Sequence, residues 1–186
     1  MRTTILAALA LSVVLTAPLT ADAQIATGAT APDFTTQGAL AGKEFTLNLK
    51  KQLRKGPVVL YFYPMSFTPG CSAEAQAFAA ATPQFKAAGA TVIGMAADPI
   101  DKLKDFSTKD CASKFAVAQA TPAIIDVYDV ALQRNGAKTA MNSRTSFVIT
   151  PVGKVIYAHS EMSPAPHIRN TRPQTHSDRR GLGPNC

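Results

Sequence analysis

The segment from Val58 to Cys71 constrains the fold of this chain more than any other stretch of its sequence. Residues 57–63 form an unbroken apolar run, which predicts a strand that is buried on both faces of a sheet. After a loop bounded by proline and glycine, Cys71 opens an alanine-rich stretch that predicts a helix over residues 71–88, with a kink or a break at Pro83. A thiol at a helix N-terminus lies at the positive end of the helix dipole, which favours the reactive thiolate.

The rest of the chain continues the alternation of strands and helices. Residues 42–47 alternate like a short edge strand, and residues 90–95 predict a second buried strand. We expect Asp98 to cap the next helix, residues 115–120 to be irregular, and residues 122–130 to form a short helix. This order of elements indicates an α/β fold in which helices cover both faces of a sheet.

The pattern Pro64-x-x-x-Thr68-x-x-Cys71 resembles the active-site signature of peroxiredoxins, which are thiol peroxidases on a thioredoxin fold. Its longer form, Tyr63-Pro64 followed by Thr68-Pro69-Gly70-Cys71-Ser72-Ala73-Glu74, is typical of the PrxQ, or bacterioferritin-comigratory, type. The resemblance covers residues 28–163. It implies a thioredoxin-like three-layer α/β/α domain with a mixed central sheet, and peroxide reduction that depends on a thioredoxin-like donor.

Peroxide reduction is the attack of a thiolate on one peroxide oxygen while the other oxygen leaves with negative charge, so the site needs fixed donors. Thr68 can supply a hydroxyl, the helix start can supply a free backbone N–H, and Pro64, which has no N–H, can wall the pocket. Peroxiredoxins place an arginine at the mouth of a late strand, and Arg144 matches, because it precedes an apolar strand and the turn at residues 151–154. Glu74, one helical turn after the thiol, either orients this arginine, hydrogen-bonds at the helix start or is a simple helix acid.

The chain has three cysteines, an odd number for an exported protein. Oxidation of Cys71 gives a sulfenic acid, which needs a second thiol to become a disulfide. The usual PrxQ partner is missing because Gln76 stands at its position, whereas some members carry that cysteine on the following helix, near the end of which Cys111 lies. We therefore expect a Cys71–Cys111 disulfide, formed after local unwinding. The alternatives are a structural Cys111 with an external resolving thiol, and resolution by Cys186 of a partner subunit.

Residues 1–23 indicate a secretory signal peptide, with a basic start, an apolar stretch and an Ala-x-Ala cleavage site. We therefore expect an exported, periplasmic protein whose peroxiredoxin domain covers residues 24–165. Residues 166–186 are rich in proline, glycine and polar side chains and carry no helical apolar period, which predicts a disordered, atypical C-terminal tail. This tail departs from the PrxQ type, which usually ends in a packed amphipathic helix.

Nineteen basic and twelve acidic residues give a formal net charge of +7, but no basic run with interleaved aromatic residues supports nucleic-acid binding. After removal of the signal, no stretch is apolar enough to predict a membrane span. His159, His167 and His176 lack metal-ligand spacing and are expected on the surface, and no metal, flavin or haem is implied. We expect a monomer rather than a dimer, with a peroxide substrate and a thioredoxin-like reductant.

Two other functions compete with a peroxidase. A thioredoxin-like disulfide reductase would need Cys-x-x-Cys, which is missing after Cys71. A non-catalytic redox sensor or a thiol-dependent chaperone would use the same cysteine, and turnover with peroxide distinguishes it from an enzyme. The sequence favours a thiol peroxidase that reduces hydrogen peroxide and organic hydroperoxides to water and alcohols, with five catalytic residues: Cys71, Thr68, Arg144, Pro64 and Cys111.

Overall fold

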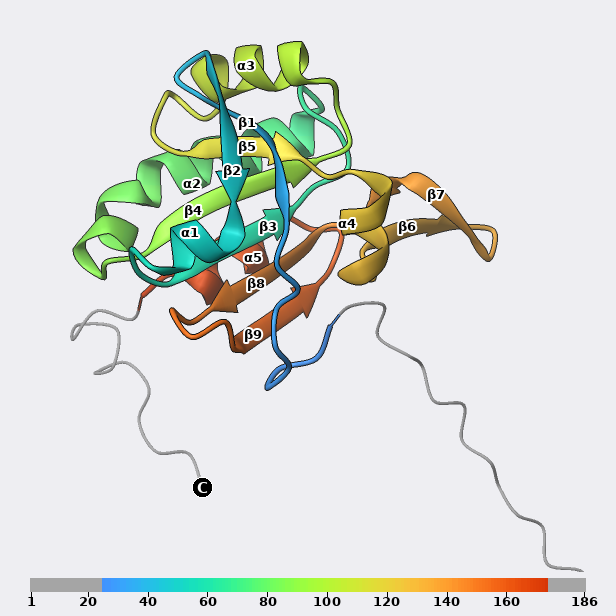
Figure 1. The fold of residues 1–186 in the computed structure, drawn as a ribbon. Helices are drawn as coiled ribbons and strands as arrows, with labels where there is room; N and C mark the ends of the chain where they lie inside the picture. The colour runs from blue at the N-terminus through green and yellow to red at the C-terminus, as the bar shows by residue number, and fades with distance from the viewer. Residues whose placement is uncertain (1–24, 174–186) are drawn as a thin grey trace, which may run out of the picture.

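A computed structural model describes residues 25–173, which form one mixed seven-stranded sheet, covered by helices on both faces, and a separate two-stranded hairpin (Figure 1). The strands of the sheet lie in the order β2-β1-β5-β4-β3-β8-β9, and β6 pairs with β7. The strands are β1 (Thr35–Leu40), β2 (Lys43–Asn48), β3 (Val58–Phe62), β4 (Thr91–Ala96), β5 (Ala116–Gln119), β6 (Ala131–Arg134), β7 (Ala137–Asn142), β8 (Thr145–Ile149) and β9 (Val155–Ser160). The helices are α1 (Leu49–Leu53), α2 (Pro69–Ala87), α3 (Ile100–Lys109), α4 (Pro122–Val127) and α5 (Ala165–Thr171).

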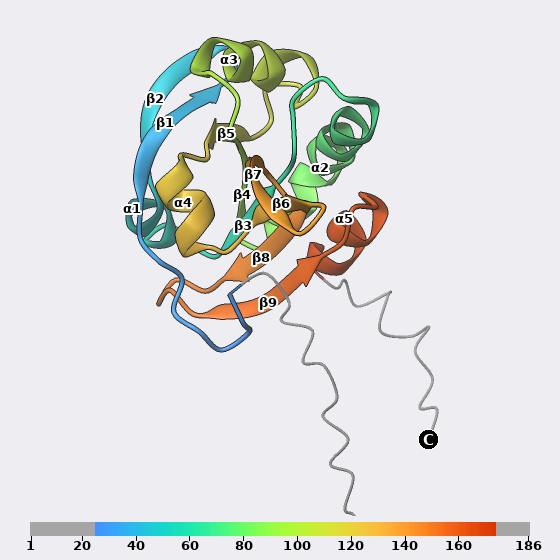
Figure 2. The same ribbon diagram turned by 90° about the vertical axis from the view of Figure 1, so that its right-hand side faces the viewer.

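Strand β3 lies at the centre of the sheet, where it pairs in parallel with β4 and antiparallel with β8. All five of its residues are buried, as the unbroken apolar run predicts. Helices α2, α3 and α5 lie on one side of the sheet and α1 and α4 on the other, so the predicted α/β fold with a mixed central sheet in three layers is confirmed (Figure 2).

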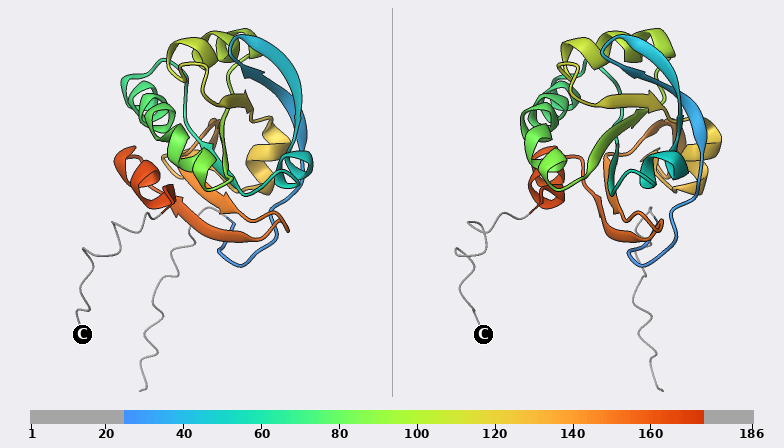
Figure 3. Two further views of the ribbon diagram at one scale, coloured as in Figure 1. Left: turned by 90° about the vertical axis from the view of Figure 1, so that its left-hand side faces the viewer. Right: turned by 60° about the vertical axis from the view of Figure 1, so that its left-hand side comes forward.

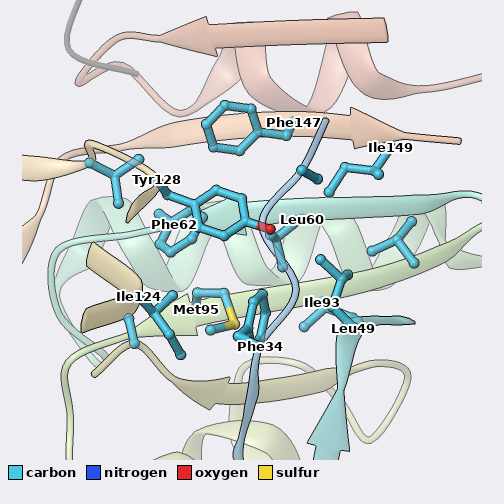
Figure 4. Packing of buried hydrophobic residues seen from close by; sticks show 14 of the residues in the cluster. Phe34, Leu49, Leu60, Phe62, Ile93, Met95, Ile124, Tyr128, Phe147 and Ile149 are labelled. Carbon is cyan, nitrogen blue, oxygen red and sulfur yellow. The ribbon is translucent and has the colours of Figure 1, made fainter. Parts of the chain in front are cut away.

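The side chains on the two faces of β3 pack into two separate apolar cores. Val59, Tyr61 and Tyr63 point towards α2 and α3, where they pack with the residues around Phe78 and Phe106. Leu60 and Phe62 point the other way, into the cluster around Tyr128 and Phe147 that Figure 4 shows. Alternation along a single strand therefore divides the interior into one core on each face of the sheet.

Two local expectations are wrong. Residues 116–119 are not irregular but form β5, which pairs in parallel with β4 and antiparallel with β1. A strand this short and alanine-rich has no pattern of its own, and its two neighbours stabilise it. Asp98 does not cap α3, because Pro99 occupies the cap position and the Asp98 carboxylate instead accepts a hydrogen bond from the backbone N–H of Ser66, at 2.7 Å.

Helix α2 is longer than expected at its start and continues unbroken through Pro83. It begins at Pro69, a residue type suited to the first turn because its missing N–H would have no helical partner there. Because the helix continues to Ala87, a break at Pro83 is excluded. The proline lies one turn from the helix end at Ala87, so little helix follows the lost hydrogen bond.

The expectation of a disordered tail from residue 166 is wrong for its first part. Helix α5 occupies residues 165–171, beside α2 and against β8 (Figure 3). Its two buried residues are the polar His167 and Thr171, and only the half-buried Ile168 adds an aliphatic side chain to the cluster around Phe78. The Thr171 hydroxyl donates to the His167 carbonyl at 2.6 Å. A polar face of this kind shows no apolar period, which is why the sequence pattern missed it. The remainder of the predicted tail, residues 174–186, and the predicted signal peptide lie outside the described residues.

Within residues 25–173, no helix combines the length and the apolar character that crossing a bilayer requires.

Gly94 is required by the close approach of β4 to a ring on β3. It pairs with Tyr61, and a Cβ added at Gly94 would lie 2.9 Å from the Tyr61 Cζ and hydroxyl oxygen. We expect Gly94→Ala to lower the free energy of unfolding by about 1–3 kcal/mol, because the ring has no free space to enter. Urea unfolding measures this cost. Tyr61→Phe is the matched background. The buried Tyr61 hydroxyl has no partner among the described residues, so removing it should be nearly neutral for stability. In that background Gly94→Ala should cost less, because one of the atoms that the new Cβ meets is gone. An equal cost in both backgrounds would contradict this packing argument.

Candidate active site

Cys71 lies in the first turn of α2, at the edge of the sheet where β3 ends. Thr68 is the cap residue in an extended conformation, and the first helical hydrogen bond runs from the Ser72 N–H to the Thr68 carbonyl at 2.8 Å. The backbone N–H groups of Gly70 and Cys71 therefore precede the helical ladder and are available to a bound group. The Cys71 side chain is 2% exposed, so the thiol is at the bottom of the site.

Arg144 brings a permanent positive charge to this thiol from the opposite side. It stands between β7 and β8, is 4% exposed, and its Nη2 lies 3.3 Å from Cys71 Sγ. Its Nη1 donates to the Glu74 carboxylate, and its Nε donates to the Met162 carbonyl at 3.0 Å. The guanidinium therefore has three directed partners and faces the sulfur in a fixed orientation.

Glu74 is the partner that orients this arginine, which decides among the roles considered for it. It lies on the same face of α2 as Cys71, one turn further along, and is 0% exposed. Burial raises the pKa of the Glu74 carboxyl to about 8, against the opposing effects of the Arg144 charge and hydrogen bond. One carboxylate oxygen, Oε1, has no partner among the described residues, so Arg144 is the group that satisfies this side chain.

Two polar residues that the sequence analysis did not assign to the site, Asn142 and Asp98, hold the loop between β3 and α2. The Asn142 amide donates to the carbonyls of Tyr63 and Met95, at 3.3 and 3.0 Å, and so ties the ends of β3 and β4 together. The Asp98 carboxylate binds the Ser66 N–H, and the Tyr63 hydroxyl lies 3.1 Å from the Ser66 hydroxyl. In the sequence, only the closeness of Asn142 to Arg144, two residues later, could have linked Asn142 to the site.

The other residues of the signature line this loop. Pro64 starts it and is half-buried, and the Thr68 hydroxyl donates to the Met65 carbonyl at 3.1 Å. Phe67 adopts a left-handed conformation, with φ of 67°, and its ring stacks edge-on against Phe106 of α3 at 5.2 Å. A bulky residue in this conformation is strained, so packing against α3 holds the loop in place.

Cys111 lies two residues beyond the end of α3 rather than within the helix. It is fully buried in the same apolar cluster as Cys71, and both are free thiols. Burial raises the pKa of the Cys111 thiol above its ordinary value, with a smaller contribution from Asp110 in the same direction. The structure therefore brings Arg144 and Glu74 to Cys71 but leaves Cys111 as a separate, protonated thiol. Cys186 lies outside the described residues.

The histidines do not all lie on the surface. His167 is 0% exposed, which corrects the expectation, whereas His159 is half-buried and places its Nε2 3.3 Å from a Glu161 carboxylate oxygen. In the described part of the chain, no group of three or more His, Cys, Asp or Glu side chains is placed to hold a metal ion. His176 lies outside that part.

Comparison with known proteins gives a consistent result. Residues 27–158 match the AhpC/TSA family. The chain is 31% identical over 112 residues to peroxiredoxin Bcp of Xanthomonas campestris, covering 59% of this chain and 70% of that protein. It is 38% identical over 87 residues to the chloroplastic peroxiredoxin Q of Sedum lineare, covering 47% of this chain and 45% of that protein, so it spans less than half the length of this plant relative.

Solved structures show the same relationship. Peroxidoxin BcpB of Mycobacterium tuberculosis has a TM-score of 0.67 at 29% identity, over 79% of this chain and 98% of that one. The bacterioferritin comigratory protein of Xanthomonas campestris, described for its alkyl peroxide reduction activity, has a TM-score of 0.63 at 28% identity, over 72% of this chain and 85% of that one.

Burial of His167 makes stability depend on pH. Desolvation lowers the pKa of His167 to about 4, with smaller contributions from the charges of His159 and Arg144 in the same direction. The unfolded chain binds a proton at this imidazole more tightly than the folded protein does. The stability that the neutral, buried His167 contributes is therefore complete above the ordinary pKa of about 6.5 and is lost as the pH falls towards 4. We expect the free energy of unfolding to fall over that range by about 2–3 kcal/mol more in the wild type than in His167→Gln. Urea unfolding from pH 4 to 7.5 measures both slopes, and parallel curves would contradict the assignment.

Proposed function

Because the chain belongs to the AhpC/TSA family of peroxiredoxins and is a thiol peroxidase, we propose that it reduces hydrogen peroxide and organic hydroperoxides through the thiolate of Cys71. The observation that carries this proposal is the 3.3 Å contact between Arg144 Nη2 and Cys71 Sγ at the start of α2. A fixed positive charge and the helix N-terminus both favour the thiolate, the form that attacks peroxide.

In the proposed reaction, the Cys71 thiolate attacks one oxygen of the peroxide and the O–O bond breaks. The sulfur keeps that oxygen as a sulfenic acid, and the other oxygen leaves as hydroxide or alkoxide and takes a proton to give water or an alcohol. Arg144 and the free N–H of Cys71 face the position where this negative charge develops. Donors that are already oriented stabilise such charge without reorganisation, and burial strengthens them.

Thr68 and Pro64 complete the proposed pocket. Since the Thr68 proton is donated to the Met65 carbonyl, the hydroxyl oxygen is left to accept a hydrogen bond from the peroxide oxygen that carries hydrogen. Pro64 offers no N–H, so it can shield the sulfur without competing for it.

We further propose that Cys111 resolves the sulfenic acid, which yields a Cys71–Cys111 disulfide and water, and that a thioredoxin-like dithiol reduces this disulfide. Cys111 is fully buried, so the segment that carries it must open first. The next two residues, Ala112 and Ser113, both have left-handed φ angles, of 48° and 57°, which are unfavourable for residues other than glycine. Strain of this kind lowers the free energy that opening this turn requires.

The burial of Cys111 also favours the alternative, a one-cysteine peroxidase that is resolved by an external thiol. Membership of the AhpC/TSA family argues against the other alternative, a non-catalytic redox sensor or thiol-dependent chaperone. For the whole protein, we propose export to the periplasm, which rests on the signal-peptide pattern of residues 1–23 alone. We also propose that it functions as a monomer.

Intact mass and peptide mapping after one equivalent of hydrogen peroxide test this function directly. We expect the wild type to lose two hydrogens and to yield a peptide that links Cys71 to Cys111, because the resolving thiol captures the sulfenic acid. Cys111→Ser should instead stop at a sulfenic acid on Cys71. A sulfenic acid in both proteins would assign resolution to an external thiol, and an unreacted Cys71 would refute the peroxidase.

Gln76 provides a test of the opening step. Its side-chain amide donates to the Asp110 carboxylate at 3.1 Å, which ties the turn that carries Cys111 to helix α2. We expect Gln76→Ala to speed disulfide formation by up to about fivefold, the equivalent of one hydrogen bond of about 1 kcal/mol. Stopped-flow measurement of disulfide formation after a single peroxide pulse gives the rate. Lys86→Ala, at an exposed position further along the same helix, is the control, and an equal rate for all three proteins would show that opening does not limit the step.

A further inference from the structure

We propose that His167 is a positioning residue for Arg144, and that helix α5 thereby sets the reactivity of Cys71. The inference rests on the proposed function, because it concerns the guanidinium that activates the same thiol. It adds to that function a residue that touches neither sulfur nor substrate. The chain of contacts runs from the imidazole through the segment after β9 to the guanidinium.

Three consecutive residues hold Arg144 by its backbone and its side chain. The Glu161 N–H donates to the Arg144 carbonyl at 3.1 Å, and the Ser160 hydroxyl donates to the same oxygen at 3.4 Å. The Met162 carbonyl accepts from Arg144 Nε at 3.0 Å. A shift of this segment would therefore move the guanidinium together with its main chain, and Nη2 would leave the sulfur.

The sheet alone does not fix that segment. Strand β9 is at the edge of the sheet, and its last pair with β8 joins Thr145 and Ser160. Glu161 and Met162 lie past this pair, and Met162 is 54% exposed. Outside the ladder, the position of a backbone depends on the side chains that bind it.

His167 supplies the missing attachment. Its Nε2 lies 2.8 Å from the Glu161 carbonyl, and its Nδ1 lies 2.8 Å from the Ser146 hydroxyl. A carbonyl only accepts, so Nε2 carries the proton, and Nδ1 of the neutral ring accepts from Ser146. The rigid ring thus links β8, through Ser146, to the segment that holds Arg144.

Burial of the imidazole and a hydrogen bond from α5 to α2 keep His167 in place. His167 is 0% exposed, so no water can take over its two hydrogen bonds without a rearrangement. Further along, Arg172 Nε donates to the Gln84 side chain of α2 at 2.8 Å. Helix α5 is therefore tied to the helix that carries Cys71 and Glu74, and the two helices hold the guanidinium from both sides.

The test is the rate at which iodoacetamide alkylates Cys71, measured by peptide mapping, together with the rate of Cys71 oxidation by hydrogen peroxide. His167→Leu removes both hydrogen bonds at similar volume and should lower both rates by about tenfold, because small displacements of an oriented group are costly. In His167→Gln the amide nitrogen takes the place of Nε2 and can still donate to Glu161, so this variant should keep most of the rate. Arg169→Ala, on the exposed side of the same helix, should match the wild type.

A double-mutant cycle distinguishes positioning from general destabilisation. In an Arg144→Lys background the guanidinium is gone, so His167→Leu should change the alkylation rate little. An equal fall in both backgrounds, an equal fall in His167→Leu and His167→Gln, or a wild-type rate in His167→Leu would each overturn the proposal. All rates are measured below the unfolding transition of every variant.

The alkylation assay uses no peroxide, so it tests the positioning role even if the proposed function fails. A wild-type protein whose Cys71 is alkylated but not oxidised by peroxide would refute the peroxidase. A wild-type protein that is oxidised, alongside an unaffected His167→Leu, would refute the role of His167 alone.

Discussion

The site depends on a guanidinium and a carboxyl group that have both been taken out of water. Arg144 is 4% exposed and Glu74 is 0% exposed. A buried ion costs several kcal/mol to desolvate, and this cost is what raises the pKa of the Glu74 carboxyl to about 8. Such a pair is stable only where the remaining donors also find acceptors, and here those acceptors are the Met162 carbonyl and the Cys71 sulfur. The thiol is therefore part of the set of groups that satisfies the buried guanidinium.

This requirement accounts for the arrangement of the elements around the site. Helix α2 brings Cys71 and Glu74 on one face, the start of β8 brings Arg144, and the segment after β9 brings the carbonyl that binds it. Asn142 then locks the ends of β3 and β4 at the base of the loop. In a dry environment of this kind, a charge acts on a neighbouring sulfur more strongly than it would in water.

Local sequence patterns were sufficient for the centre of the fold and for the residues of the signature. The apolar run of β3 is a local signal, and the structure buries all five of its residues as expected; the spacing from Pro64 to Cys71 is local as well, and it pointed to the loop and the helix start where Arg144 meets the thiol. The failures are residues whose state depends on distant partners. Strand β5 exists because β1 and β4 flank it, and His167 is buried because Ser146 and Glu161 bind it. No window of neighbouring residues contains these partners.

The division of the interior into two cores has a consequence for the redox cycle. Cys71 and Cys111 both belong to the core under α2 and α3, and Phe106 of that core packs against Phe67 of the loop before α2. The core around Tyr128 and Phe147, on the far face of the sheet, contains neither cysteine. Rearrangement between a dithiol and a disulfide can therefore be confined to one hemisphere of the molecule. The core on the far face can stay packed and keep the strands in register while the core that contains the cysteines loosens and repacks.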